Sequence, residues 1–101
     1  MKTFDVKYSD MFFNDLKAIV QYIFEQSGRV ETARHFYENV LDSIEKRAFG
    51  ADSFGKFQPY AGAPDYYRIY FGHYTIFYVL TEDEMEVRRI LWSGRDLSRH
   101  L

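Results

Sequence analysis

The residues best suited to chemistry in this sequence are basic and lie near its carboxyl end. Residues 88–101 hold four arginines against one acidic residue, although the whole chain has a formal net charge of -2 at pH 7: Arg88, Arg89, Arg95 and Arg99 against Asp96. Arginine side chains bind phosphate, and aromatic rings stack on unpaired bases. With an aromatic content of 20%, this pattern is compatible with an RNA site, but cleavage would require further groups.

A nuclease needs side chains that transfer a proton at the scissile phosphate or stabilise the charge that develops there. The candidates are Arg68 in a predicted strand, together with Arg95 and His100 in the tail. The sequence contains no glycine-rich phosphate loop, no nucleophile elbow and no HExxH motif. Conventional hydrolase signatures are therefore missing.

The composition also argues against a metal site, a cofactor and a membrane span. There is no cysteine, and the three histidines are far apart in the sequence without a second ligand at metal-binding spacing. We therefore expect no metal and no cofactor. The first residues lack the apolar core of a signal peptide, and no stretch approaches the ~20 apolar residues of a membrane span. We expect a cytoplasmic protein that has no contact with membranes.

Hydrophobic periodicity predicts the elements that position these residues. Residues 2–8 alternate as a short strand, and Ser9 and Asp10 can cap a helix that follows. Apolar residues then recur every three or four positions to about Gln26, where Ser27 and Gly28 end the helix. A second helix is predicted over residues 30–47, and the short break between the two helices implies an antiparallel hairpin.

The second half of the chain predicts a sheet. Residues 48–65 contain both prolines and three glycines and are expected to form a long loop. Three strands follow over residues 66–71, 74–80 and 85–92, separated by hairpin-length turns. The predicted fold is a single α+β domain over residues 1–101, with the order β-α-α-β-β-β and a helical hairpin packed on a small antiparallel sheet.

Strict alternation in the last strand separates its two arginines. It places Arg88 and Ile90 on one face and Arg89 and Leu91 on the other. One arginine must then lie on the helix-covered face or at its edge. Because an unpaired buried charge is very costly, that arginine should have a carboxylate or aromatic partner.

The ten phenylalanines, nine tyrosines and one tryptophan exceed what a core of this size normally contains. Several of these rings are expected at the surface, which favours a protein interface. Phe13 and Phe24 lie off the centre of the apolar stripe of the first helix and are candidates for that surface.

The order of elements, the helix stripe DLKAIVQYI and the carboxyl-terminal block HYTIFYVLTEDEMEVRRILWSGRDLSRHL together resemble the ParE-like branch of the RelE/ParE toxin superfamily. The similarity covers nearly the whole chain and is most specific in YTIFYVL, EVRRIL and the following GRDL step. Members are the toxins of type II toxin-antitoxin pairs. The resemblance implies an antitoxin whose carboxyl-terminal segment wraps the toxin.

The superfamily contains ribosome-dependent mRNA endonucleases of the RelE type and DNA gyrase inhibitors of the ParE type. Compared with the RelE pattern, Thr75 stands where a strand arginine is expected, and Leu101 falls near the terminal tyrosine, one position from His100. Compared with the ParE pattern, Trp92 replaces the usual histidine and Ser93 intervenes before the glycine. The low net charge also favours the ParE type.

The resemblance therefore implies a toxin that inhibits gyrase by binding it. We expect its target-binding residues to be Trp92, Arg95, Arg99 and His100, because tryptophan and arginine often anchor interfaces. A ParD-like antitoxin is expected to cover Phe13 and Phe24, and operator DNA would be contacted only through that antitoxin. The alternative is a RelE-like endonuclease that uses Arg68, Arg95 and His100.

Overall fold

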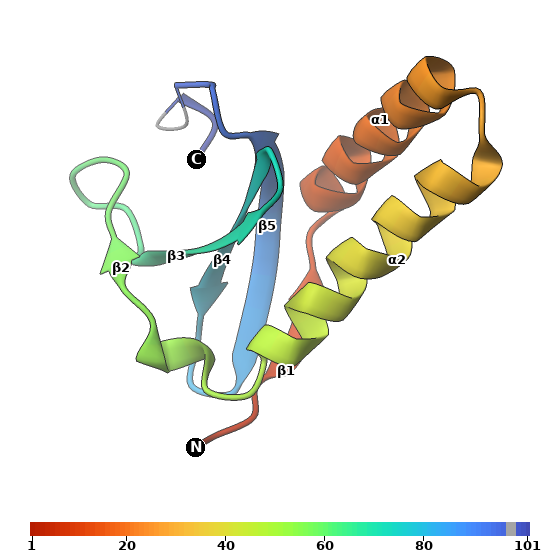
Figure 1. Cartoon of the computed structure of the whole chain (residues 1–101). Coiled ribbons are helices and arrows are strands. Elements are labelled where there is room, and N and C mark those ends of the chain that lie inside the picture. Colours follow the sequence, from red (N-terminus) through yellow and green to blue (C-terminus); the bar gives the residue numbers. More distant parts are fainter. Residues whose placement is uncertain (97–98) are drawn as a thin grey trace.

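The computed structural model describes residues 1–96 and 99–101, and it confirms the predicted order of elements (Figure 1). A short strand precedes two helices of equal length, and the remaining strands follow. The elements are β1 (Asp5–Tyr8), α1 (Asp10–Ser27), α2 (Val30–Arg47), the 3-10 helix η1 (Ala51–Ser53), β2 (Lys56–Phe57), β3 (Tyr66–Phe71), β4 (Tyr74–Leu80) and β5 (Glu84–Trp92).

The sheet has five strands in the order β1-β5-β4-β3-β2. Strands β2 to β5 pair antiparallel, as predicted, whereas β1 runs parallel to β5, so the sheet is mixed rather than wholly antiparallel. The helical hairpin lies between β1 and the other strands in the chain. The first strand after it, β2, runs in the opposite direction to β1. The predicted loop at 48–65 contains η1 and the two-residue strand β2.

Local capping sets the limits of the helical hairpin. The Ser9 hydroxyl accepts a hydrogen bond from the Phe12 amide at 3.1 Å and begins α1. Gly28 ends α1 with φ +67°, and its amide donates to the Phe24 carbonyl at 2.7 Å. A left-handed conformation at this position suits glycine. The chain therefore turns sharply enough for α2 to begin at Val30.

The hairpin covers one face of the sheet, and the carboxyl-terminal residues and the loop that carries β2 lie on the other side (Figure 1). The main core lies between the helices and the sheet, where Phe12, Leu16 and Ile44 pack against residues such as Ile76 and Tyr78. A smaller cluster occupies the outer face of the sheet and consists of Tyr66, Phe77, Val79 and Leu91, with Phe57 and Leu101 against it.

A bulge in β5 changes which residues face the helices. Phe77 is opposite Arg89, but the next residue, Tyr78, is opposite Val87, so Arg88 is an extra residue in the ladder. Ile90 consequently joins Val87 in the helix-facing core instead of pointing with Arg88. The predicted strict alternation is therefore wrong at this point, because it assumed an uninterrupted pleat.

Candidate binding surfaces

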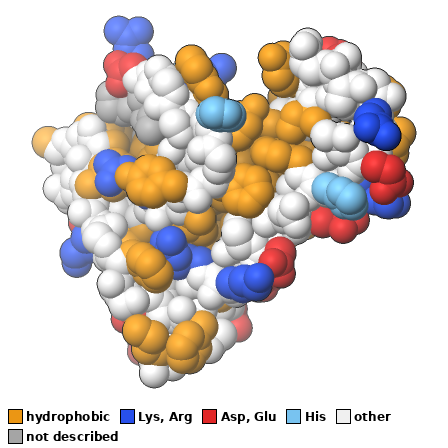
Figure 2. Space-filling model, in the orientation of Figure 1, with side chains coloured by type: hydrophobic (Ala, Val, Ile, Leu, Met, Phe, Trp, Pro, Cys, Tyr) orange, Lys and Arg blue, Asp and Glu red, His pale blue; other side chains and the backbone are white. Residues whose placement is uncertain are grey.

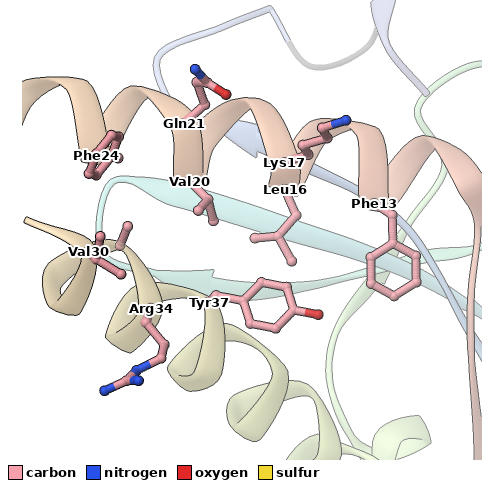
Figure 3. Close-up of a pocket in the computed structure, with 10 residues that line it drawn as sticks. Phe13, Leu16, Lys17, Val20, Gln21, Phe24, Val30, Arg34 and Tyr37 are labelled. Atoms are coloured by element: carbon pink, nitrogen blue, oxygen red, sulfur yellow. The ribbon is translucent and has the colours of Figure 1, made fainter.

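The first candidate surface is a groove of about 740 Å³ between the two helices, which we call the interhelical groove. In Figure 3, apolar side chains of α1 point toward α2, and side chains of α2 point back. The polar groups of Lys17, Gln21 and Arg34 lie at the margins. The lining residues are Phe13, Leu16, Lys17, Val20, Gln21, Phe24, Val30, Ala33, Arg34 and Tyr37.

The structure brings Phe13 and Phe24, the two predicted antitoxin-binding residues, into this same groove. Their exposed fractions are 41% and 42%, and Val30 and Tyr37 on α2 are also exposed. Phe13 is supported from below by Tyr8 and Phe12, whose rings lie 5.2 and 5.4 Å away between centroids. The groove therefore presents aromatic and aliphatic surface to solvent on fixed helices.

The second candidate surface is a groove of about 620 Å³ between α1 and the ends of β4 and β5, which we call the C-terminal groove. Figure 2 shows hydrophobic side chains gathered in a hollow between the helical hairpin and the sheet. The C-terminal groove is lined by Asp15, Ala18, Ile19, Tyr22, His73, Tyr74, Ile90, Leu91, Trp92 and Arg95. Two of the four predicted target-binding residues, Trp92 and Arg95, therefore share one site.

Gly94 supports the ring of Trp92, whose side chain is 56% exposed. A Cβ atom at position 94 would lie only 2.5 Å from Trp92 Cη2, so any larger residue there would displace the ring. The Arg95 amide donates to the Trp92 carbonyl at 3.1 Å and closes the turn. The indole thus lies against Gly94 in a closed turn and lines the C-terminal groove.

The two departures from the superfamily pattern at Thr75 and Ser93 contact each other. Their hydroxyl oxygens are 2.8 Å apart, and Thr75 is 1% exposed. The Ser93 amide also donates to the His73 carbonyl at 2.8 Å. The threonine that occupies the expected position of a strand arginine therefore anchors the turn after β5.

The other two predicted target-binding residues, Arg99 and His100, come after the groove residue Arg95 in the sequence. The Arg99 side chain is 82% exposed and lies 3.5 Å from an Asp96 carboxylate oxygen. The His100 carbonyl accepts a hydrogen bond from Arg89 at 2.9 Å. The end of the chain is thereby attached to β5.

The expected carboxylate partner of a strand arginine is Asp15 on α1. Arg89 binds it through two nitrogens at 2.7 and 2.9 Å, and both side chains are about 15% exposed or less. The hydrogen bond with Asp15 raises the pKa of Arg89 despite its burial. Burial lowers the pKa of Arg88, but its bonds with Glu86 and Tyr66 outweigh that effect and leave it raised.

The three residues of the nuclease alternative have different surroundings. Arg68 follows the helix-facing Tyr67, projects from the outer face of the sheet and stacks on the Phe57 ring at 3.6 Å from its centroid. Arg95 instead lines the C-terminal groove beside α1. The backbone of His100 is held by Arg89. The described residues thus show Arg68 and Arg95 on separate surfaces.

Within residues 1–96 and 99–101, no three histidine or acidic side chains are grouped so that they could hold a metal ion. No helix among the described residues is both long enough and apolar enough to cross a membrane.

Comparison with known proteins identifies the family. Residues 6–97 match the model of the ParE toxin of the type II toxin-antitoxin system parDE. The chain belongs to the ParE toxin family. A similar solved structure is a chain of the chromosomal ParDE toxin-antitoxin system from P. aeruginosa, with a TM-score of 0.73 and 15% sequence identity. The alignment covers 89% of this chain and 96% of that chain. No curated protein matches the sequence.

Two residues of the C-terminal groove were not predicted from the sequence. Tyr22 and His73 line the C-terminal groove with Trp92, yet they come from α1 and from the turn between β3 and β4. Tyr22 is 57% exposed and lies outside the buried apolar stripe of α1. The sequence does contain a signal for Tyr22: it is an aromatic residue at a position that the helical period predicts to be exposed.

Proposed function

We propose that this ParE-family protein inhibits DNA gyrase by binding it, stalls the cleaved-DNA intermediate, and is neutralised by a cognate ParD-like antitoxin. The family match supports the assignment as the toxin of a type II pair. The target-binding surface in this proposal consists of Trp92, Arg95, Arg99 and His100.

The observation that carries the proposal is the exposed Trp92 held beside Arg95 in the C-terminal groove. A few tryptophan and arginine side chains usually supply most of the binding energy of a protein interface. Gly94 supports the indole from below, so little conformational entropy is lost when a partner covers it. This arrangement suits binding without bond cleavage.

The antitoxin occupies the interhelical groove in this proposal. An amphipathic segment can bury its apolar side chains against Phe13, Phe24 and Tyr37. Lys17 and Arg34 at the margins favour acidic residues flanking that apolar stripe, although Arg34 also pairs with Glu31 and Glu38. Antitoxin and target would then contact different surfaces of the same toxin.

A supercoiling assay tests the gyrase assignment. The toxin is purified with its antitoxin, released from it and added to gyrase and relaxed plasmid. We expect loss of supercoiling and accumulation of cleaved DNA, both reversed by adding the antitoxin. In parallel, translated mRNA is incubated with ribosomes and toxin. Specific cuts in that mRNA with unaffected supercoiling would contradict the proposal and favour the RelE-like alternative.

A further inference from the structure

Two adjacent arginines of β5 are connected to residues 100 and 101, Arg89 directly and Arg88 through Tyr66. Arg89 Nη1 donates directly to the His100 carbonyl at 2.9 Å. Arg88 Nη1 donates to the Tyr66 hydroxyl at 3.0 Å, and that hydroxyl donates to the Leu101 carbonyl at 3.4 Å. The bulge in β5 makes Arg88 the extra residue in the ladder. Two consecutive side chains of β5 are thus part of the hydrogen bonds that attach residues 100 and 101, the end of the C-terminal tail, to the sheet.

The guanidinium of Arg89 is fixed by Asp15 before it reaches the tail. Arg89 Nε and Nη2 donate to the two carboxylate oxygens at 2.7 and 2.9 Å, which leaves Nη1 for the His100 carbonyl. Asp15 Oδ2 also accepts from the Ile90 amide at 3.2 Å. A bidentate pair of this kind restricts a planar guanidinium to one orientation. The third donor is therefore aimed at the tail.

Burial strengthens this arrangement. The Arg89 and Asp15 side chains are only 14% and 15% exposed, whereas the Arg99–Asp96 pair in the tail itself is 82% and 64% exposed. Exposed ion pairs contribute little because water screens them. The Asp15–Arg89 pair is thus the better-ordered attachment, and it links α1, β5 and the tail at one point.

We propose that Asp15 and Arg89 are positioning residues that hold Arg99 and His100 in the orientation required for target binding. This inference rests on the proposed function, because it assigns the tail to the target surface. A short exposed segment that is ordered beforehand loses less entropy on binding. The pair also neutralises Asp15 within the C-terminal groove, where Trp92 and Arg95 lie, and so leaves that groove free of an unpaired carboxylate.

The substitution Arg89→Lys tests the proposal. Lysine keeps the positive charge facing Asp15 but lacks the planar fork that serves a carboxylate and a carbonyl together. We expect the backbone order parameters of residues 99–101 to fall below about 0.6. We also expect gyrase inhibition and growth inhibition on induction to weaken on the order of tenfold, as the loss of one charge-assisted hydrogen bond would cause. Antitoxin affinity should change less than about twofold.

Asp15→Asn is the second variant, because asparagine has nearly the same shape and can still accept from the Ile90 amide. It should loosen the tail in the same direction. Lys46→Gln is the matched control, since it breaks the exposed Lys46–Asp42 pair on α2 and should alter none of these measurements.

Unchanged order parameters in both variants would overturn the positioning role, as would a loss of inhibition that merely follows the fraction of folded protein. If the wild-type toxin leaves gyrase unaffected, the proposed function fails instead. The order parameters and the growth assay then still decide whether the pair positions a toxic tail.

Discussion

At the scale of single residues, the proposed target surface depends on contacts that leave almost no room for change. Trp92 rests on Gly94, and Ser93 between them is bonded to Thr75 and to the backbone of His73. The Trp92 ring, the turn after β5 and the start of β4 therefore form one unit. A surface anchor that is supported in this way can bind a partner without first being ordered.

Substitution Gly94→Ala should damage target binding while leaving the fold intact. The new Cβ would lie 2.5 Å from the indole, so the ring must move. Because Trp92 is the only tryptophan, its fluorescence reports the displacement directly. We expect a red-shifted emission and gyrase inhibition weakened about tenfold, because displacing the ring removes part of the ~2 kcal/mol or more that an interface anchor contributes.

The control is Gly55→Ala, where an added Cβ meets no atom within 4 Å. It should reproduce wild-type emission and inhibition. An unchanged spectrum and unchanged inhibition in Gly94→Ala would show that the support of the ring is irrelevant to the target.

From the sequence, individual residues of the proposed site could be named as candidates, but their contacts could not be predicted. Trp92 and Arg95 could be selected by type and position in the chain. The bond between Thr75 and Ser93 could not, because both looked like isolated departures from a pattern. The same holds for Asp15 and Arg89, which are 74 positions apart and meet only through the packing of α1 on β5.

At the scale of elements, the helical hairpin buries one side on the sheet and leaves the interhelical groove open. The start and the end of α1 were both predictable, since the Ser9 cap and the Gly28 terminus are local signals. The groove was not predictable in detail, because its shape depends on how far apart the helices lie. The bulge in β5 was likewise hidden, since no glycine or proline marks it.

Phe24→Ala should weaken antitoxin binding far more than it weakens the fold. Phe24 is 42% exposed, so truncation should lower the free energy of unfolding by about 1 kcal/mol or less. As an exposed aromatic residue of the groove, Phe24 should contribute at least about 2 kcal/mol to antitoxin binding. Isothermal titration with the antitoxin measures the second quantity and urea unfolding the first.

Tyr60→Ala supplies the comparison, because Tyr60 is an exposed aromatic in the loop before β3 and lies outside the groove. Its removal should leave the antitoxin affinity unchanged. Equal affinities for Phe24→Ala and Tyr60→Ala would locate the antitoxin elsewhere.

At the scale of the whole molecule, the aromatic surplus divides between core and surface. Tyr78 is fully buried and its hydroxyl donates to the Ala51 carbonyl at 2.8 Å, whereas Tyr70 is 73% exposed. Burial raises the pKa of Tyr8, Tyr74 and Tyr78 above the ordinary value of 10.0. For Tyr8, the nearby Glu45 carboxylate raises it further.

Stability should consequently decline in alkali. Above about pH 10, the unfolded chain releases phenol protons that the folded chain retains, so the free energy of unfolding falls as the pH rises and is unaffected by these groups below that pH. Urea unfolding at about pH 8, 10 and 11 measures the trend. Tyr8→Phe removes one titrating group and should show a shallower decline; an identical slope would contradict this account.

The parallel pairing of β1 with β5 has a consequence for translation. The partners of residues 5–8 are residues 84–87, so β1 cannot pair in the sheet until residues 84–87 have been synthesised and have left the ribosome. Chains emerge at about 5–20 residues per second. For several seconds after its own synthesis, β1 therefore has no strand to pair with. A chain that stops before residue 84 would therefore lack the strand that β1 pairs with, as well as the arginine that holds His100.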